Sequence, residues 1–137
     1  MNERDLRTGN IVGFVLPDQP VIVSEILKYN DEYFLETLTI DGETGNAGRP
    51  IDDFEPIPLT EEWRIKCGLI KDGELTYTHK DLEGQMVYFD IAQNAYFNDV
   101  NVCGDFDQCV FIKMPEFVHT LQNWWPLLTG KELEIKL

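Results

Sequence analysis

The chain has 137 residues and a formal net charge of -14, with 43% hydrophobic and 26% charged residues. This length fits one domain with a packed core, and the composition excludes a wholly disordered chain. A surface this acidic repels phosphate backbones and anionic lipids, so we expect no direct binding to nucleic acid or to a membrane.

The cysteines and the first residues indicate a reducing compartment. Cys67, Cys103 and Cys109 contain no C-x-x-C pair, and an odd number of cysteines makes a poor disulfide framework. The segment from Met1 to Arg7 lacks the apolar core of a signal peptide, and no stretch approaches the roughly 18 apolar residues of a membrane span. We therefore expect a cytoplasmic protein with reduced thiols.

The N-terminal half reads as a series of short strands separated by turn residues. Runs rich in β-branched and aromatic residues predict strands, and Gly, Pro, Asn and Asp between them predict turns. The glycine-rich segment 41–50 is expected to be an exposed loop. The predicted strands cover residues 11–16, 21–26, 33–40 and 51–55. Such closely spaced strands favour a barrel-like antiparallel meander over residues 1–58.

The C-terminal half begins with a short linking helix. Thr60 is a suitable N-cap, Glu61 and Glu62 suit the first turn, and Gly68 can end the helix. Strands are then predicted over 75–79, 85–92 and 108–113 as a second antiparallel sheet. The apolar spacing from Phe117 to Leu128 predicts a C-terminal helix that packs on this sheet.

The fold class expected is therefore α+β, in the order barrel-like meander, linking helix, second antiparallel sheet and C-terminal helix. Residues 1–137 are expected to form a single domain, with sub-domains 1–58 and 59–137 as the alternative.

No segment carries a recognisable catalytic or metal-binding motif. Ser24 is the only serine and lies in a predicted strand instead of a nucleophile elbow. The stretch 99–105 is similar to a calcium loop, but Cys103 at its fifth place and Val110 at its twelfth are the wrong ligands. The alternative is a thiolate–imidazolium pair of Cys103 or Cys109 with His79 or His119, although buried thiols are the simpler interpretation. We predict no catalytic residue, no metal site and no cofactor.

The last predicted helix supplies the candidate binding residues. His119, Gln122 and Asn123 share the side opposite the aromatic stripe and could present a hydrogen-bonding patch, although a solvated face is the simpler interpretation. Trp125 is the fourth candidate binding residue. The adjacent side chains of Trp124 and Trp125 point about 100° apart on a helix, which favours partial exposure of one of the two. Pro126 removes the donor for the carbonyl group of Gln122, which could kink the helix and leave that carbonyl free for a ligand.

Three segments together show a resemblance. They are Asp5-Leu-Arg-Thr-Gly-Asn-Ile-Val12, Phe54-Glu-Pro-Ile-Pro-Leu-Thr-Glu-Glu-Trp-Arg-Ile-Lys-Cys-Gly68 and His119-Thr-Leu-Gln-Asn-Trp-Trp-Pro-Leu-Leu-Thr-Gly-Lys-Glu-Leu133. This pattern is similar to a family of uncharacterised proteins from Bacteroides-type bacteria and their phages or mobile elements. The chain departs from the family at Trp124-Trp125-Pro126. The resemblance implies a genomic context and transfers no mechanism.

Three functional hypotheses follow from the sequence. The leading one is a non-enzymatic binding or accessory protein of a mobile element or phage-related region, with an unknown protein partner. The first alternative is an acidic decoy that binds a basic nucleic-acid-binding protein, as the net charge suggests. The second alternative is a small enzyme that uses His119 or a cysteine. The sequence does not define the oligomeric state.

Overall fold

The computed structural model describes residues 5–16, 18–85, 87–91, 100–101 and 109–137. The chain forms two compact units, which are described separately. The first unit comprises Met1–Leu59, Glu116–Glu132 and Leu137, and the second comprises Thr60–Pro115 and Leu133–Lys136.

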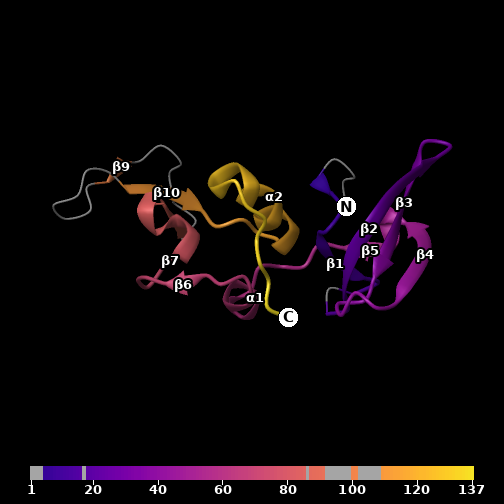
Figure 1. Ribbon diagram of the computed structural model, residues 1–137, viewed down its shortest axis with the longest axis horizontal. Helices are drawn as coiled ribbons and strands as arrows, with labels where there is room; N and C mark the ends of the chain where they lie inside the picture. Colours follow the sequence, from indigo (N-terminus) through magenta and orange to yellow (C-terminus); the bar gives the residue numbers. More distant parts are fainter. Residues whose placement is uncertain (1–4, 17, 86, 92–99, 102–108) are drawn as a thin grey trace. The chain divides into compact units, whose positions relative to one another are not determined.

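The first unit is built on a curled antiparallel sheet with the strand order β4-β3-β2-β1-β5 (Figure 1). Strands β1 to β4 each pair with the strand that follows in the chain, and β5 pairs with the other side of β1. The 3-10 turn Ile51–Asp53 leads into β5. The strands are β1 (Ile11–Phe14), β2 (Pro20–Tyr29), β3 (Glu32–Leu38), β4 (Gly45–Pro50) and β5 (Phe54–Glu55). The prediction of an N-terminal barrel-like meander is confirmed.

The long β2–β3 hairpin has a tight turn at Asn30 and Asp31. Both residues have positive φ, 50° and 65°, as in the turns whose twist matches that of the flanking strands. The turn sets the register, so that Tyr29 pairs with Glu32 and Leu27 with Phe34.

Strand β4 is a difference from the predicted loop over residues 41–50. Its six residues, Gly-Asn-Ala-Gly-Arg-Pro, are all exposed and pair with β3 alone. Glycine and proline are poor strand formers, but an edge strand needs only one hydrogen-bonded neighbour. Pairing with β3 therefore overrides the local preference of this segment.

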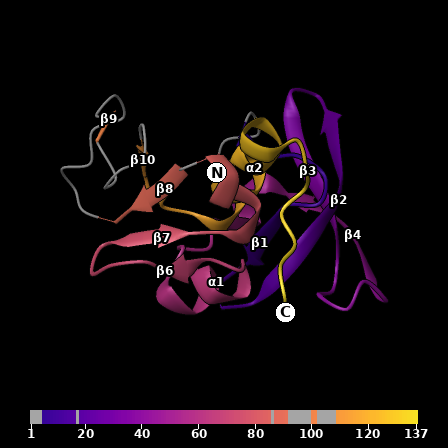
Figure 2. The same cartoon turned by 60° about the vertical axis from the view of Figure 1, so that its left-hand side comes forward.

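The C-terminal helix α2 (Val118–Thr129) belongs to the first unit, where it contacts β1 (Figure 2). Its fully buried residues include Val118, Leu121 and Trp125, and the backbone N–H of Val118 donates to the carbonyl of Ile57 at 2.9 Å. We expected this helix to pack on the second sheet. The structure assigns the helix to the first unit, through its contacts with β1.

Helix α2 has the ends that the sequence predicts and runs through its internal proline. Gly130 ends the helix at a φ of 73°, and its N–H donates to the carbonyl of Pro126. The assigned helix continues past Pro126 to Thr129. The predicted helix over 117–128 is therefore confirmed in extent.

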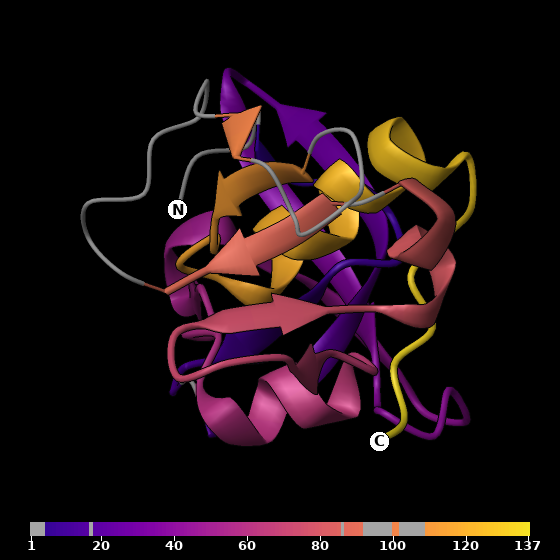
Figure 3. The ribbon, with the colours of Figure 1, turned by 90° about the vertical axis from the view of Figure 1, so that its left-hand side faces the viewer.

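The second unit begins with helix α1 (Glu61–Lys66), which Thr60 caps by accepting a hydrogen bond from the N–H of Trp63. Its sheet has the order β6-β7-β8-β10-β9, which faces the viewer in Figure 3. A 3-10 helix, Lys80–Gln85, precedes β8. The strands are β6 (Ile70–Lys71), β7 (Thr76–Thr78), β8 (Val87–Asp90), β9 (Val100–Asn101) and β10 (Cys109–Lys113).

The second sheet is mixed, whereas we predicted an antiparallel one. Strand β10 pairs with β8 in parallel and with β9 antiparallel. A parallel pair needs a connection of about a dozen residues or more, and the segment between Asp90 and Cys109 is long enough. The α+β class is confirmed, with this pairing corrected. Among the described residues, no helix is long and apolar enough to cross a membrane.

Candidate functional site

The side of α2 that we expected to face solvent is largely buried. His119 is 4% exposed, Gln122 8% and Trp125 0%, and Trp124 is half-buried. The expectation of an exposed patch at His119 and Gln122 is therefore wrong, and of the two adjacent tryptophans it is Trp124 that is partly exposed. At Gln122 the reason is that the N-terminal segment covers the side chain through polar contacts.

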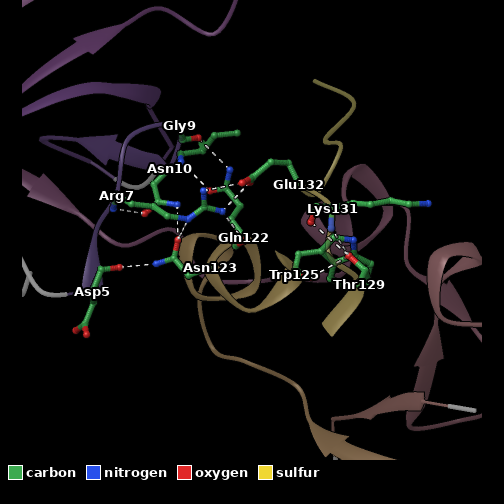
Figure 4. A network of polar contacts seen from close by, with 11 residues as sticks. Asp5, Arg7, Gly9, Asn10, Gln122, Asn123, Trp125, Thr129, Lys131 and Glu132 are labelled. Carbon is green, nitrogen blue, oxygen red and sulfur yellow. Dashed lines mark hydrogen bonds and ion pairs between the residues drawn. The ribbon is translucent and has the colours of Figure 1, made fainter. Parts of the chain in front are cut away.

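Gln122 binds the start of β1 as another peptide group would. Its Oε1 atom accepts from the backbone N–H of Ile11 at 2.8 Å, and its Nε2 atom donates to the carbonyl of Gly9 at 3.1 Å (Figure 4). A buried side-chain amide needs partners for its oxygen and its nitrogen, and both are supplied here. Gln122 therefore fixes the position of the chain before β1.

The side chain of Asn123 forms hydrogen bonds with three residues of the same N-terminal segment. Its Oδ1 atom accepts from Nε of Arg7 at 2.7 Å and from Nδ2 of Asn10 at 2.9 Å. Its Nδ2 atom donates to the carbonyl of Asp5 at 2.7 Å, and Oδ1 of Asn10 accepts from the N–H of Arg7 at 2.8 Å. Asn10 is fully buried, so these contacts also satisfy a polar group inside the unit.

Arg7 supplies the donor that Pro126 takes away. Its Nη2 atom donates to the carbonyl of Gln122 at 2.7 Å. In a regular helix this carbonyl would accept a hydrogen bond from the backbone N–H of residue 126, which proline lacks. Nη2 also forms an ion pair with Glu132 at 2.8 Å, and hydrogen bonding from Arg7 lowers the pKa of that carboxyl group. The carbonyl that the sequence left open for a ligand is thus bound within the chain.

We call Arg7, Asn10, Gln122 and Asn123 the polar clamp. Its members lie in two of the three segments that carry the family resemblance, and Figure 4 shows them converging from the N-terminal segment and α2. Their hydrogen-bonding groups are directed at one another and at backbone groups. The polar clamp therefore holds the first unit together and does not present a free binding surface.

His119 is buried without a hydrogen-bonding partner for Nδ1 among the described residues. Its ring stacks on Phe117 at a centroid distance of 5.9 Å. Burial lowers its pKa below the ordinary histidine value, with the carboxylate of Asp5 acting in the opposite direction. A general base needs an orienting partner and access to substrate, and His119 shows neither in the part of the chain described.

The second unit contains a buried histidine next to a cysteine. Nδ1 of His79 accepts from the N–H of Asp81 at 3.0 Å, and burial lowers the imidazole pKa, while Asp81 opposes this shift. Cys67 is fully buried, and burial raises the pKa of its thiol to about 12. Only a negligible fraction of Cys67 is thiolate at neutral pH, which makes it a poor nucleophile. Cys103 and the side chain of Cys109 lie outside the described residues.

No metal centre is formed by the described residues. They contain no group of three or more His, Cys, Asp or Glu side chains that could hold a metal ion. Most of the calcium-loop-like stretch 99–105 lies outside them.

A small pocket of about 130 Å³ lies on the curled sheet of the first unit. Its lining offers hydrogen-bonding groups and an aromatic ring, and it contains no general base that could activate the hydroxyl group of Thr37. The lining residues are Phe14, Thr37, Asn46, Ala47 and Arg49. The guanidinium of Arg49 lies over the ring of Phe14 at 5.9 Å. This composition allows binding of a small group and provides no means of bond cleavage.

The β2–β3 hairpin carries a second kind of surface. Alternate residues along paired strands point to the same face, so the register places six side chains on one side of the hairpin. We call this surface the outer face, because the alternate residues of the two strands point to the opposite side of the hairpin. Leu35, which pairs with Ile26 on that opposite side, is fully buried in the core. The outer face consists of the cross-strand pairs Glu25–Glu36, Leu27–Phe34 and Tyr29–Glu32.

The outer face is a feature that the strand patterns alone do not reveal, although the turn residues carry a signal for it. Asn30 and Asp31 lie between the predicted strands 21–26 and 33–40 and are residue types that favour a turn, and a two-residue turn fixes which residues of the two strands are opposite. Counting outward from the turn gives the three pairs directly.

Comparisons with known proteins identify no relative. No family model matches the chain, no curated protein matches it, and no solved structure matches it.

Proposed function

We propose that this protein is a non-enzymatic, cytoplasmic binding protein that serves a mobile element or phage-related region. The observation that carries the proposal is that the polar clamp directs the hydrogen-bonding groups of Arg7, Gln122 and Asn123 inward. These polar side chains are thus used to hold the fold together. The genomic setting rests on the family resemblance alone.

The two histidines support the same conclusion. Both are buried and have pKa values below the ordinary value, so both are neutral at pH 7. A neutral imidazole can act as a base only when a substrate proton comes within about 3 Å, which their burial opposes. The thiol of Cys67 is held protonated by its burial.

Affinity purification of the tagged chain from its native host, followed by mass spectrometry, tests this proposal. We expect a protein partner at near-stoichiometric yield. Turnover of a small molecule that is lost on changing His119→Gln or His79→Gln, while the urea midpoint is kept, would show an enzyme and refute the proposal.

The outer face favours a second candidate function, an acidic decoy that occupies a basic nucleic-acid-binding protein. Glu25 and Glu36 lie directly opposite each other, and like charges in that position destabilise a sheet. A basic partner would relieve this repulsion. The described acidic residues are exposed or half-buried and none is buried, so their charge is available to such a partner.

Salt dependence and competition distinguish this second function. We expect the host complex to dissociate as ionic strength rises, and added DNA to compete with this protein for the partner. A complex that survives high salt and ignores DNA would support the general binding function and refute the decoy.

A further inference from the structure

The outer face combines exposed apolar side chains with acidic ones. Tyr29 is 60% exposed, Leu27 and Phe34 are half-buried, and the rings of Tyr29 and Phe34 meet edge to face at 5.9 Å. Together these three side chains make an apolar stripe along the hairpin. Glu25 and Glu36 lie at one end of this stripe.

Glu32 lies at the other end of the stripe, opposite Tyr29, so acidic residues bracket it. All the charged residues of the three cross-strand pairs are therefore glutamates. The nearest cation in the hairpin, Lys28, pairs with Tyr33 on the opposite side, with its ammonium 5.6 Å from that ring. Charge on the hairpin is thus segregated by face.

The neighbouring edge strand leaves the outer face open. A side chain at Gly48 would meet Cβ of Phe34 at 3.7 Å, Cδ1 of Leu27 at 3.9 Å and Cγ of Glu36 at 4.0 Å. Gly48 therefore lies beside the stripe, and its lack of a side chain keeps the stripe accessible. Strand β4 also has no second neighbour in the sheet, so nothing in the described sheet continues over this edge.

We propose that the outer face binds a partner segment in which apolar side chains are flanked by lysines or arginines. This inference rests on the proposed binding function and assigns it a surface and a partner chemistry. Apolar side chains of the segment contact Leu27, Tyr29 and Phe34, while its cations pair with the bracketing glutamates.

Charge complementarity selects this occupant over others. A second copy of the chain would place its own glutamates against the same glutamates, which is repulsive. A nucleic acid or an anionic membrane would meet the same repulsion. A basic amphipathic protein segment satisfies both the apolar stripe and the acidic ends.

Titration with synthetic peptides tests the surface independently of the natural partner. The probes are an alternating leucine–lysine peptide, a leucine–glutamate peptide of equal length and polylysine. Binding is measured by calorimetry and mapped by amide NMR shifts. We expect the leucine–lysine peptide alone to bind with localised shifts, which concentrate on residues 25–36.

Matched variants locate the binding energy. We expect E25Q/E36Q to weaken the leucine–lysine peptide about tenfold, since two exposed ion pairs together contribute about that factor. The control E61Q/E74Q removes the same charge from exposed residues of the second unit and should change affinity less than about twofold. Y29S, at an exposed position, should weaken binding about threefold or more through lost apolar contact.

Three results would overturn the proposal. Equal weakening by the control pair, or equal binding of polylysine, would show diffuse attraction to the acidic surface. Absence of leucine–lysine binding would show that the face does not recognise this chemistry. Concentration-dependent self-association that buries Tyr29 would show a second copy as the occupant. In each case a partner captured from the native host would still support the proposed binding function, so the two can fail separately.

Discussion

The bond between Arg7 and the carbonyl of Gln122 makes a quantitative prediction about the internal proline. If Arg7 replaces the donor that Pro126 lacks, then restoring that donor with Pro126→Ala should make Arg7 less important. The test is a double-mutant cycle that combines Pro126→Ala with Arg7→Met, which keeps most of the aliphatic stem of residue 7 and removes its charged donors.

The expected magnitudes follow from the contacts. Arg7 is 37% exposed and donates to two neutral acceptors, Oδ1 of Asn123 and the carbonyl of Gln122. Hydrogen bonds from a charged group contribute about 1.5 kcal/mol at the lower end, so Arg7→Met should cost about 3 kcal/mol. In the Pro126→Ala background the carbonyl keeps an intrahelical donor, and the same change should cost about 1.5 kcal/mol. The expected coupling energy is therefore about 1.5 kcal/mol.

Urea unfolding followed by tryptophan fluorescence measures this cycle. Trp63 lies in the second unit, so a Trp63→Phe background restricts the signal to Trp124 and Trp125 of α2. Glu132→Gln serves as the control, because it removes only the exposed ion pair to Arg7 and should have little effect in either background. If Arg7→Met costs the same with Pro126 in place as in the Pro126→Ala background, within about 0.3 kcal/mol, our account of the proline is wrong.

Three further predictions concern stability. Gly68 has a φ of 79°, and a Cβ atom added there would lie 2.9 Å from Nε2 of His79, whereas Gly130 has a φ of 73° with open space around it. Gly68→Ala should therefore lower the free energy of unfolding by at least about 1 kcal/mol more than Gly130→Ala does. Equal losses in the two variants would contradict this prediction. Burial lowers the pKa values of His79 and His119 below the unfolded value of 6.5, so the unfolded chain binds more protons below that pH. Stability should therefore be full above pH 6.5 and fall as the pH is lowered towards the folded pKa values, and a urea midpoint that stays level or rises below pH 6.5 would refute the assignment. Glu36→Lys should stabilise the chain by about 0.5 kcal/mol, because it turns a like-charge pair into an ion pair; an unchanged or lower urea midpoint would count against the cross-strand repulsion.

Features governed by residues close in the sequence could be predicted. Thr60 and Gly68 bracket α1, and Gly130 ends α2 in the left-handed conformation that glycine favours. The turn at Asn30 and Asp31 was likewise visible from its residue types. In each case the residue types that indicate the structure lie within a few positions of the structure that they form.

Features governed by distant pairing could not be predicted. Strand β4 forms from a glycine-rich segment only because β3 offers it an edge. The parallel pairing of β8 with β10 depends on the path of the connection between them, about which local propensity says nothing.

The burial of Gln122 illustrates the same limit at the candidate site. On a helix, polar residues opposite an apolar stripe normally face water, and this rule failed because Arg7 and Gly9, more than 110 positions away, bring polar partners to that side. One clue was available in the sequence. Pro126 leaves a carbonyl without a donor, and a buried carbonyl without a donor implies a cation or amide from elsewhere in the chain.

The order of the chain connects the polar clamp to the surface that we propose for binding. The first unit is interrupted by the second, and the N–H of Leu59 donates to the carbonyl of Glu116 at 2.8 Å, which holds the two ends of the interruption together. The clamp therefore joins α2 to the N-terminal segment only after the chain has passed through the second unit, and it is a non-local contact of the kind that slows folding.

The clamp is made by the segment before β1 and by α2, while the outer face belongs to β2 and β3. Because the two sets share no residue, variants of the clamp should lower stability without changing peptide affinity, and variants of the outer face should do the reverse. Loss of affinity in a folded clamp variant would mean that the binding surface includes α2 after all.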